Sequence, residues 1–390
     1  MVGGTSPYVG REQAWVKHQV LRRYLESLAL KVGGFRPGTT LNYIDGFSGP
    51  WDAELDDFGD SSPVIAMRQL AAAKTTLGKQ GKEFAPRAMF VEENAKAFDR
   101  LRIACANAPV TGRAFNGSFE DHIDDAVRFG KQGPNPFAFV FIDPTGWTGF
   151  ALPRIAPLLR VRPSEVLINF MWGHIGRFVE NERPAIEGQF EDLFGEDTTA
   201  HRARWHALHG PDREDDVVRT YCACVRKVGG FAHCVSTVIV KPTSDRTHYH
   251  LVFATRSLKG LTTFREIERR VAPLQQGARV TAKQRKEEKS TGQASLFPAE
   301  EIETDPYLRS LEVRYRSRAR AEVEERLLPG RDVPYDEVVA LALGSPLTSE
   351  ADLKGWLQEW SRAGQVRIVG LEGRERSPKI GAGHVVRRVG

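Results

Sequence analysis

Residues 231–255 read FAHCVSTVIVKPTSDRTHYHLVFAT, and this stretch narrows the choice of fold. Two runs within it, 231–240 and 248–255, are rich in β-branched and aromatic residues, which is typical of strands. The sequence KPTSDR at 241–246 separates the two runs and indicates a turn. We therefore expect the two strands to pair antiparallel, as a hairpin.

The chain before this hairpin alternates between short apolar runs and helical patterns. The apolar runs end at Asp45, Glu92, Phe115, Asp143 and Phe170. Helical patterns follow the first four runs, and an apolar stripe from Trp15 to Leu28 predicts one more helix at the start. Such alternation predicts a doubly wound, mostly parallel α/β sheet of the Rossmann-like type, which ends in the antiparallel hairpin.

The residues after the hairpin predict a linker and a second, smaller domain. Residues 271–305 lose hydrophobic periodicity and are rich in Gln, Lys, Glu and Ser, so we expect a flexible basic linker there. A charged helix, two shorter helices and two strands around a Gly- and Arg-rich tip follow, which indicates a winged helix. The expected domains are therefore 1–270, with an insertion near 171–212, and 306–390.

Composition excludes several classes of protein. Apolar residues make up 41% and charged residues 27% of the 390 positions, as in globular proteins, and four cysteines are too few for a disulfide scaffold. No apolar run approaches the roughly 20 residues of a membrane helix, and the first residues lack the pattern of a signal peptide. We expect a cytoplasmic protein without membrane contact.

The net charge of +5 is distributed unevenly. Residues 1–255 carry 30 Lys and Arg against 30 Asp and Glu, whereas residues 256–390 carry 25 against 20. The surplus therefore lies in the last third of the chain. It favours an anionic partner there, although an ordinary solvated surface explains so small a surplus equally well.

The first candidate site is the turn DGFSGP at 45–50, directly after the first strand. Glycine allows close approach of the backbone to a ligand and tolerates positive φ, so Gly46 and Gly49 suit a cofactor-binding turn. Trp51 stands where a third glycine of a phosphate-binding turn would be expected. An ordinary tight turn is the alternative.

The second candidate is Glu92, which ends the second strand. A doubly wound fold places an acid at this point to accept hydrogen bonds from ribose hydroxyls. Glu93 is adjacent, and we favour Glu92 because it directly terminates the apolar run. A solvated acid without a ligand is the alternative.

The third candidate is Asp143, which follows four large apolar residues in FVFIDPTGW at 139–147. A strand buried on both faces places this carboxylate at its carboxyl end, where open α/β sheets bind ligands. Asp143 is thus a candidate catalytic residue that would orient the accepting group. Trp147 is a second one, because its ring could stack on a flat base, or it could simply fill core.

Five segments together resemble the three-Cys-motif partner family, TcmP, over about residues 11–255. They are LNYIDGFSGP (41–50), SSP (61–63), FVEE (90–93), FIDPTG (141–146) and LINFM…R (167–177). The resemblance implies a class I methyltransferase-like fold, often followed by a winged helix, and a radical SAM partner protein that bears the three-cysteine motif.

The cofactor implied by the resemblance is S-adenosylmethionine. It would lie across the turn residues Asp45, Gly46, Phe47 and Gly49 and against Glu92, with Asp143 at the active-site end. Two departures from known patterns matter. Trp51 replaces a glycine that would leave room for the methionine part of the cofactor, and DPTG at 143–146 differs from the DPPY type of amino-methyltransferases.

Cysteine and histidine positions argue against a metal site. Cys222 and Cys224 lie two apart in a predicted helix and point in different directions, so core packing of these two and of Cys234, beside His233, is the favoured interpretation. We therefore expect no metal. His248 and His250 share one face of a strand, as exposed histidines or, alternatively, as substrate contacts.

One short segment of the predicted linker resembles the peptide that binds the bacterial sliding clamp. It is QASLF at 293–297, in which Gln293, Leu296 and Phe297 would insert into pockets of the clamp. Five residues match by chance often, so the clamp is a weaker prediction than the other partners.

The sequence leads to three hypotheses of function. The first is a methyltransferase that uses S-adenosylmethionine and acts on nucleic acid, DNA rather than RNA. In it, winged-helix arginines bind phosphates, namely Arg362, Arg367, Arg374, Arg376, Arg387 and Arg388. The second is a non-catalytic DNA-binding partner subunit with a degenerate methyltransferase fold. The third, methylation of a protein or small molecule, predicts no binding to DNA.

Overall fold

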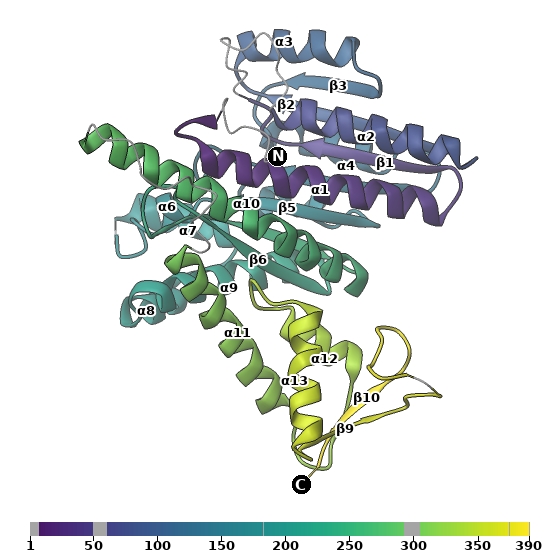
Figure 1. Ribbon diagram of the computed structural model, residues 1–390. Coiled ribbons are helices and arrows are strands. Elements are labelled where there is room, and N and C mark those ends of the chain that lie inside the picture. Colours follow the sequence, from purple (N-terminus) through teal and green to yellow (C-terminus); the bar gives the residue numbers. More distant parts are fainter. Residues whose placement is uncertain (1–7, 50–60, 182, 292–304, 374, 390) are drawn as a thin grey trace.

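A seven-stranded sheet forms the centre of the larger domain (Figure 1). The computed structural model describes residues 8–49, 61–181, 183–291, 305–373 and 375–389. The strands of the sheet are β1 (Thr39–Asp45), β2 (Phe84–Glu92), β3 (Thr111–Asn116), β4 (Pro136–Ile142), β5 (Ser164–Phe170), β6 (His233–Val240) and β7 (Thr247–Thr255). Their order across the sheet is β3-β2-β1-β4-β5-β7-β6.

The pairing within this sheet confirms the predicted fold class. β7 is antiparallel to both β5 and β6, and the other neighbouring strands are parallel. The chain leaves β1 toward β2 on one side, and later returns to place β4 on the other side of β1. The sheet is therefore a doubly wound, Rossmann-like sheet with an antiparallel hairpin, the arrangement expected for class I methyltransferases, and its switch point lies between β1 and β4.

Two layers of helices cover the sheet. One face is covered by α1 (Glu12–Phe35), α2 (Ser62–Lys79), α3 (Ala95–Ala106) and α10 (Leu258–Thr291). The other face is covered by the short η2 (Glu120–His122) and by α4 (Ile123–Gly130), α5 (Leu152–Leu159), α6 (Trp172–Ile175), α7 (Pro184–Phe194), α8 (Thr199–Ala207) and α9 (Gly210–Gly229). The helices α6 to α8 make up most of the expected insertion.

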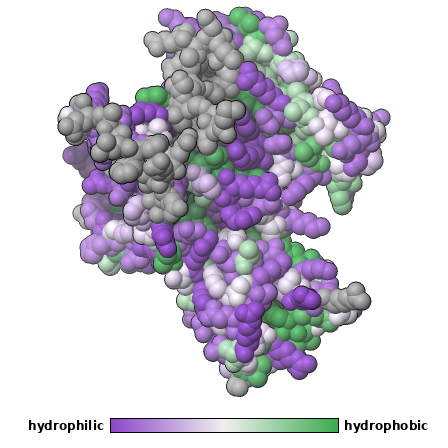
Figure 2. Space-filling model, viewed as in Figure 1, coloured by the Kyte–Doolittle hydropathy of each residue, from purple (hydrophilic) through white to green (hydrophobic). Residues whose placement is uncertain are grey.

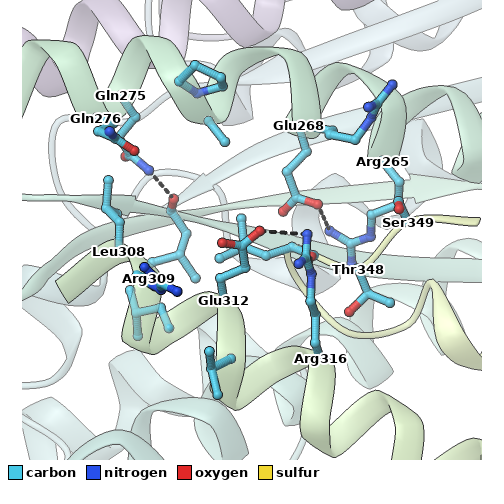
Figure 3. A pocket seen from close by; sticks show the side chains of 17 residues that line it. Arg265, Glu268, Gln275, Gln276, Leu308, Arg309, Glu312, Arg316, Thr348 and Ser349 are labelled. Atoms are coloured by element: carbon cyan, nitrogen blue, oxygen red, sulfur yellow. Dashed lines mark hydrogen bonds and ion pairs between the residues drawn. The ribbon is translucent and has the colours of Figure 1, made fainter. Parts of the chain in front are cut away.

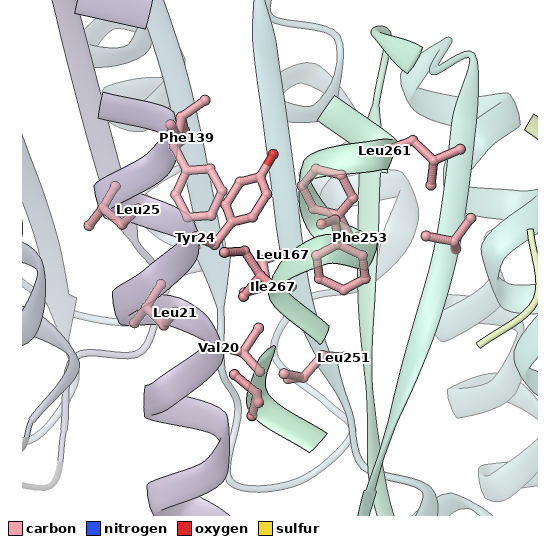
Figure 4. Close-up of a cluster of buried hydrophobic side chains, with 14 of the residues drawn as sticks. Val20, Leu21, Tyr24, Leu25, Phe139, Leu167, Leu251, Phe253, Leu261 and Ile267 are labelled. Carbon is pink, nitrogen blue, oxygen red and sulfur yellow. The ribbon is translucent and has the colours of Figure 1, made fainter. Parts of the chain in front are cut away.

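The apolar stripe of α1 packs against the sheet, as its spacing predicts (Figure 4). Tyr24 shows how tightly: its ring stacks on Phe139 of β4 with the centroids 5.7 Å apart, and its hydroxyl donates to Glu165 at 2.7 Å. Both partners are fully or almost fully buried. Burial of α1 therefore fixes its other residues, including Lys17, relative to the ends of the strands.

The smaller domain is a winged helix, as predicted. Its elements are α11 (Pro306–Arg326), β8 (Asp332–Pro334), α12 (Tyr335–Ala342), α13 (Glu350–Arg362), β9 (Val366–Val369) and β10 (Val385–Arg388). The three short strands form an antiparallel sheet in the order β8-β10-β9. Ser349 and Asp352 form a reciprocal capping box at the start of α13. The first strand, β8, has too few residues to give a sequence pattern.

The prediction of a flexible linker over 271–305 is wrong for residues 271–291. These residues continue α10, and several of them are buried, including Val271, Gln275 and Arg279. The polar residues that suggested a linker instead bond to the sheet domain, since Gln275 accepts from the backbone amide of Val240 at 3.0 Å. Residues 292–304, with the clamp-like peptide 293–297, lie outside the described residues.

The winged helix is docked on the sheet domain through buried charged residues. Arg265 of α10 donates to the carbonyl oxygens of Ser236 in β6 and of Leu343 after α12, each at 2.9 Å. Asp215 of α9 accepts from the hydroxyl of Tyr315 at 2.9 Å and from Arg318 at 2.7 Å, both in α11. Because Arg265, Asp215 and Tyr315 are buried and bonded across the junction, they hold the two domains in one arrangement.

A cavity of about 530 Å³ lies at this domain junction, between α10, α11 and the loop before α13 (Figure 3). Charged side chains project into it and pair with one another: Arg265 with Glu268 at 2.9 Å, and Arg316 with Glu312 at 2.6 Å. The surface around the junction is largely hydrophilic on the face seen in Figure 2. Within the described ranges, no helix is both long and apolar enough to cross a membrane.

Candidate active site

The carboxyl ends of β1 and β4 bring two predicted site residues to one edge of the sheet. Asp45 is the last residue of β1 and pairs in register with Phe141 of β4. Asp143 follows β4 directly. The two carboxylates therefore flank the switch point, which is where open α/β sheets bind their ligands.

Asp45 is completely buried and holds the turn that follows it. Its carboxylate accepts from the backbone amide of Phe47 at 3.1 Å, from the hydroxyl of Ser62 at 2.7 Å and from the hydroxyl of Tyr43 at 3.2 Å. Burial, together with the negative charge of Asp143, raises the pKa of Asp45 to about 7, against the lowering effect of these hydrogen bonds. Direct contact of Asp45 with a cofactor stays a prediction, because its described contacts are all within the protein.

The turn after β1 folds back over the end of β2. The backbone amide of Gly46 donates to Phe141 at 3.0 Å, and that of Ser48 donates to Val91 at 2.9 Å. A Cβ at Gly46 would lie 2.8 Å from the ring of Phe119, and a Cβ at Gly49 would lie 2.0 Å from Glu92 Oε2. Glycine is thus required at both positions for close packing. Tolerance of positive φ, the other property of glycine that suits such a turn, is not used here, because neither residue has a positive φ.

Glu92 faces this turn, and Glu93 does not. The Glu92 side chain is almost fully buried against Gly49, while Glu93 is exposed. One carboxylate oxygen, Oε1, accepts from the backbone amide of Asn94 at 2.7 Å, and burial raises the pKa of Glu92. Glu92 is therefore the inward-facing acid of the two, and its contact with a ribose stays a prediction.

Asp143 is held by two residues that the sequence analysis did not assign to the site. Its Oδ1 accepts from the amide of Asn169, at the end of β5, at 2.7 Å. Its other oxygen forms an ion pair with Lys17 of α1, which is also largely buried. The signal for Lys17 was present, because this lysine lies on the apolar face of α1 one turn before Val20 and Leu21.

Trp147 lies in an aromatic cluster. Its ring stacks on Phe178 with the centroids 5.7 Å apart and meets Phe190 edge-on at 5.0 Å. Phe47, in turn, packs against Phe119 and Phe150. These contacts favour the packing interpretation of Trp147, and its role in stacking on a base stays a prediction.

The histidine and cysteine interpretations have mixed outcomes. His250 is almost fully buried and bonds to Glu214 at 2.8 Å, so the expectation of an exposed residue is wrong for it. His248 is half-buried, and burial together with Lys241 lowers its pKa to about 4. All three cysteines, Cys222, Cys224 and Cys234, lie in the core or against it, as predicted.

The winged-helix arginines differ in whether they are already bonded to other groups of the protein. Arg387 forms a two-pronged ion pair with Asp332, with Nη2 and Oδ2 2.7 Å apart, and Arg388 donates to two carbonyl oxygens at the end of α11. Three more are exposed, namely Arg362, Arg367 and Arg376, and Arg374 lies outside the described residues. Phosphate binding by this group stays a prediction, which the internal bonds of Arg387 and Arg388 weaken.

No protein-family model and no curated protein sequence matches this chain. Among solved structures, a Legionella pneumophila protein of the DUF519 family shares 10% identity at a TM-score of 0.37, over 64% of this chain and 86% of its own. An O-methyltransferase from Bacillus cereus in complex with S-adenosylhomocysteine (SAH) shares 12% identity with this chain at a TM-score of 0.31. The match covers 60% of this chain and 80% of the O-methyltransferase.

A loganic acid methyltransferase with SAH is similar at the same level, with 12% identity and a TM-score of 0.31, over 80% of this chain and 92% of its own. Values this low assign neither substrate nor activity to the chain. The fold is established by the order and direction of its own strands, and membership of the three-Cys-motif partner family remains a resemblance.

Proposed function

We propose that the protein is a methyltransferase that uses S-adenosylmethionine as its methyl donor. The observation that carries this proposal is the meeting of Glu92, the glycine turn and Asp143 at the carboxyl edge, on both sides of the switch point between β1 and β4. Ligands of doubly wound folds bind at this place. The strand order is the one expected of the class I methyltransferases.

The residues at this edge fit the chemistry of the cofactor. The Glu92 carboxylate would accept hydrogen bonds from the ribose hydroxyls, and the turn from Gly46 to Gly49, which packs against Phe119 and Glu92, would supply backbone groups. When bound, S-adenosylmethionine supplies a methyl group on a positively charged sulfur. Asp45 contributes indirectly, because it fixes the turn through the amide of Phe47.

Asp143 would orient the group that receives the methyl. Its carboxylate would accept a hydrogen bond from an amine or hydroxyl, and would take up the proton that this group loses as it gains the methyl. Lys17 and Asn169 hold the carboxylate in place through an ion pair and a hydrogen bond. Lys17 and Asn169 are therefore positioning residues.

The acceptor that we propose is nucleic acid. The resemblance to the three-Cys-motif partner family, the winged helix and the basic surplus of the last third of the chain support it. On the same resemblance, we propose that the protein works with a radical SAM protein that bears the three-cysteine motif. A sliding-clamp contact through residues 293–297 remains a weaker proposal.

A transfer assay with methyl-labelled S-adenosylmethionine tests this function. The full-length protein is incubated with single-stranded DNA, double-stranded DNA and RNA of one sequence, and the label in each is counted. We expect incorporation into nucleic acid that is lost in Asp143→Ala and kept in Trp147→Phe. Equal label with and without the protein, in the presence of the radical SAM partner as well, would refute the proposal.

One observation favours the second candidate, a non-catalytic DNA-binding subunit. Both oxygens of Asp143 already have protein partners, Lys17 and Asn169, as in a purely structural ion pair. This candidate predicts that Asp143→Asn leaves DNA binding and any biological effect unchanged. The methyltransferase proposal predicts loss of the effect with DNA binding retained.

A further inference from the structure

A cavity of about 400 Å³ opens at the same edge of the sheet as Asp143, beyond β5. Its walls are α6, the start of α9, the turn between β6 and β7, and Tyr307 at the start of α11. α6 follows directly from β5, whose Asn169 bonds to Asp143. Because β7 is antiparallel to β5, its first residue, Thr247, also lies at this edge and lines the cavity.

The acidic side chains that line this cavity both have partners within the protein. Glu214 bonds to His250 at 2.8 Å. Asp245 pairs with Arg279 at 2.6 Å and with Lys283 at 3.1 Å. The described lining residues therefore set two acids against four basic side chains, and the basic side chains are in excess.

The basic side chains of the cavity are mostly free. Arg213 pairs with Glu180 at 2.7 Å. By contrast, Arg177, Lys241 and Arg246 have no side-chain partner among the residues that the structure describes, and two of them, Arg177 and Arg246, are exposed. Three unpaired cations around one hollow make a positive potential that attracts phosphate groups.

Two half-buried aromatic side chains, Trp172 and Tyr307, line the same cavity. The buried Arg279 fixes the turn that carries Lys241 and Arg246, because it donates hydrogen bonds to the carbonyl oxygens of Lys241 and Ser244. Cations on a fixed backbone, together with aromatic rings, are the usual parts of a site for single-stranded nucleic acid.

We infer that this cavity binds a single nucleic-acid strand, with its phosphates at Arg177, Lys241 and Arg246 and a base against Trp172 or Tyr307. The inference rests on the proposed function, since it gives the acceptor strand a path along the sheet edge toward Asp143. Binding at this cavity differs from the sequence prediction, which placed the phosphate contacts on the winged helix. The dominant contacts are thus on the larger domain.

Fluorescence anisotropy with a labelled 20-nucleotide DNA strand tests this inference, with an RNA strand of the same sequence as a second arm. The variant is Arg177→Ala/Lys241→Ala/Arg246→Ala in the full-length protein. The matched control, Arg362→Ala/Arg367→Ala/Arg376→Ala, removes the same charge from the exposed winged-helix arginines.

We expect the cavity variant to bind at least about tenfold more weakly at low salt, and the slope of log K against log salt to fall by about 2, since each single-strand phosphate contact contributes about 0.7. The control should change affinity by less than about threefold. Weakening confined to RNA assigns the site to an RNA strand. Unchanged affinity in the cavity variant, or equal losses in both variants, would overturn the inference.

A separate titration with S-adenosylhomocysteine distinguishes failure of this inference from failure of the proposed function. The cavity variant should bind this compound as tightly as wild type, which also shows that the variant is folded. If wild type binds the DNA strand through the cavity but binds no S-adenosylhomocysteine, the methyltransferase proposal fails and the strand site stands.

Discussion

The carboxyl edge of the large sheet and the winged helix differ in the burial of their charged residues. At the sheet edge, Asp45 and Asp143 come from different strands, lie largely out of water and are satisfied by residues far away in the sequence. On the winged helix, pairs such as Arg387 with Asp332 lie at the surface. Burial raises the pKa of Asp45, and buried carboxylates with shifted pKa values cluster at functional sites, whereas surface pairs are ordinary. This difference is the reason why we propose the sheet edge, and not the winged helix, as the active site.

The largest effect is expected at Asp143. Asp143→Ala should lower the rate of methyl transfer by about 100-fold or more, because a general base is lost and Lys17 is left without its partner. Trp147→Phe should change the rate less than about fivefold, since its ring is packed among other aromatic side chains. Initial rates at saturating cofactor measure both. A smaller loss in Asp143→Ala than in Trp147→Phe would reverse the assignment.

Arg265 tests how firmly the two regions are joined. Arg265→Met should lower the free energy of unfolding by about 3–5 kcal/mol, because it leaves Glu268 buried and unpaired and three carbonyl oxygens without this donor. Arg270→Met, on the exposed side of the same helix, should cost only a few tenths of a kcal/mol. Urea denaturation followed by circular dichroism measures both. Equal costs would mean that the docking contact is not formed.

The sequence predicts the acids at the sheet edge, but not the residues that pair with them or the way in which the two domains dock. Asp45, Glu92 and Asp143 can be predicted from the sequence, because an apolar run that ends in an acid is a local pattern. The pairing of Lys17 with Asp143 joins residues 126 positions apart, so the apolar face of α1 marks Lys17 as unusual but does not identify its partner. The same holds for α10, whose polar residues Gln275 and Arg279 suggest a linker until the strand and turn that they bond to are in place.

The pH dependence of stability separates the buried Asp45 from exposed acids. Its pKa, about 7, is raised above the ordinary value of 3.8, so the fold favours the neutral carboxyl. The stability from this group is present in full below about pH 4 and is lost as the pH rises through 7. Between pH 5 and 8, wild type should therefore lose about 2 kcal/mol relative to Asp45→Asn.

The control for this effect is Asp99→Asn, at an exposed position on α3. It should keep the wild-type pH profile. Unfolding by guanidinium chloride at several pH values measures the profiles of all three proteins. An Asp45→Asn profile parallel to that of wild type would show that Asp45 is ionised in the fold throughout this range.

The smallest effect is expected on the winged helix. Arg387→Ala removes a surface ion pair with Asp332 and should shift the Tm by no more than about 2 °C, with strand binding within about twofold of wild type. Differential scanning fluorimetry and anisotropy measure the two quantities. A large loss of strand binding would return the phosphate contacts to the winged helix.

The most direct test of the account is calorimetric titration of the full-length protein with S-adenosylhomocysteine, using Glu92→Gln and its neighbour Glu93→Gln as a matched pair. Glu92 faces the glycine turn and Glu93 faces solvent. We predict binding by wild type and by Glu93→Gln, and a loss of about tenfold or more in Glu92→Gln, as expected when a charged hydrogen-bond acceptor is removed. No binding by wild type at millimolar concentration, or equal affinities for the two variants, would contradict the placement of the cofactor at this edge.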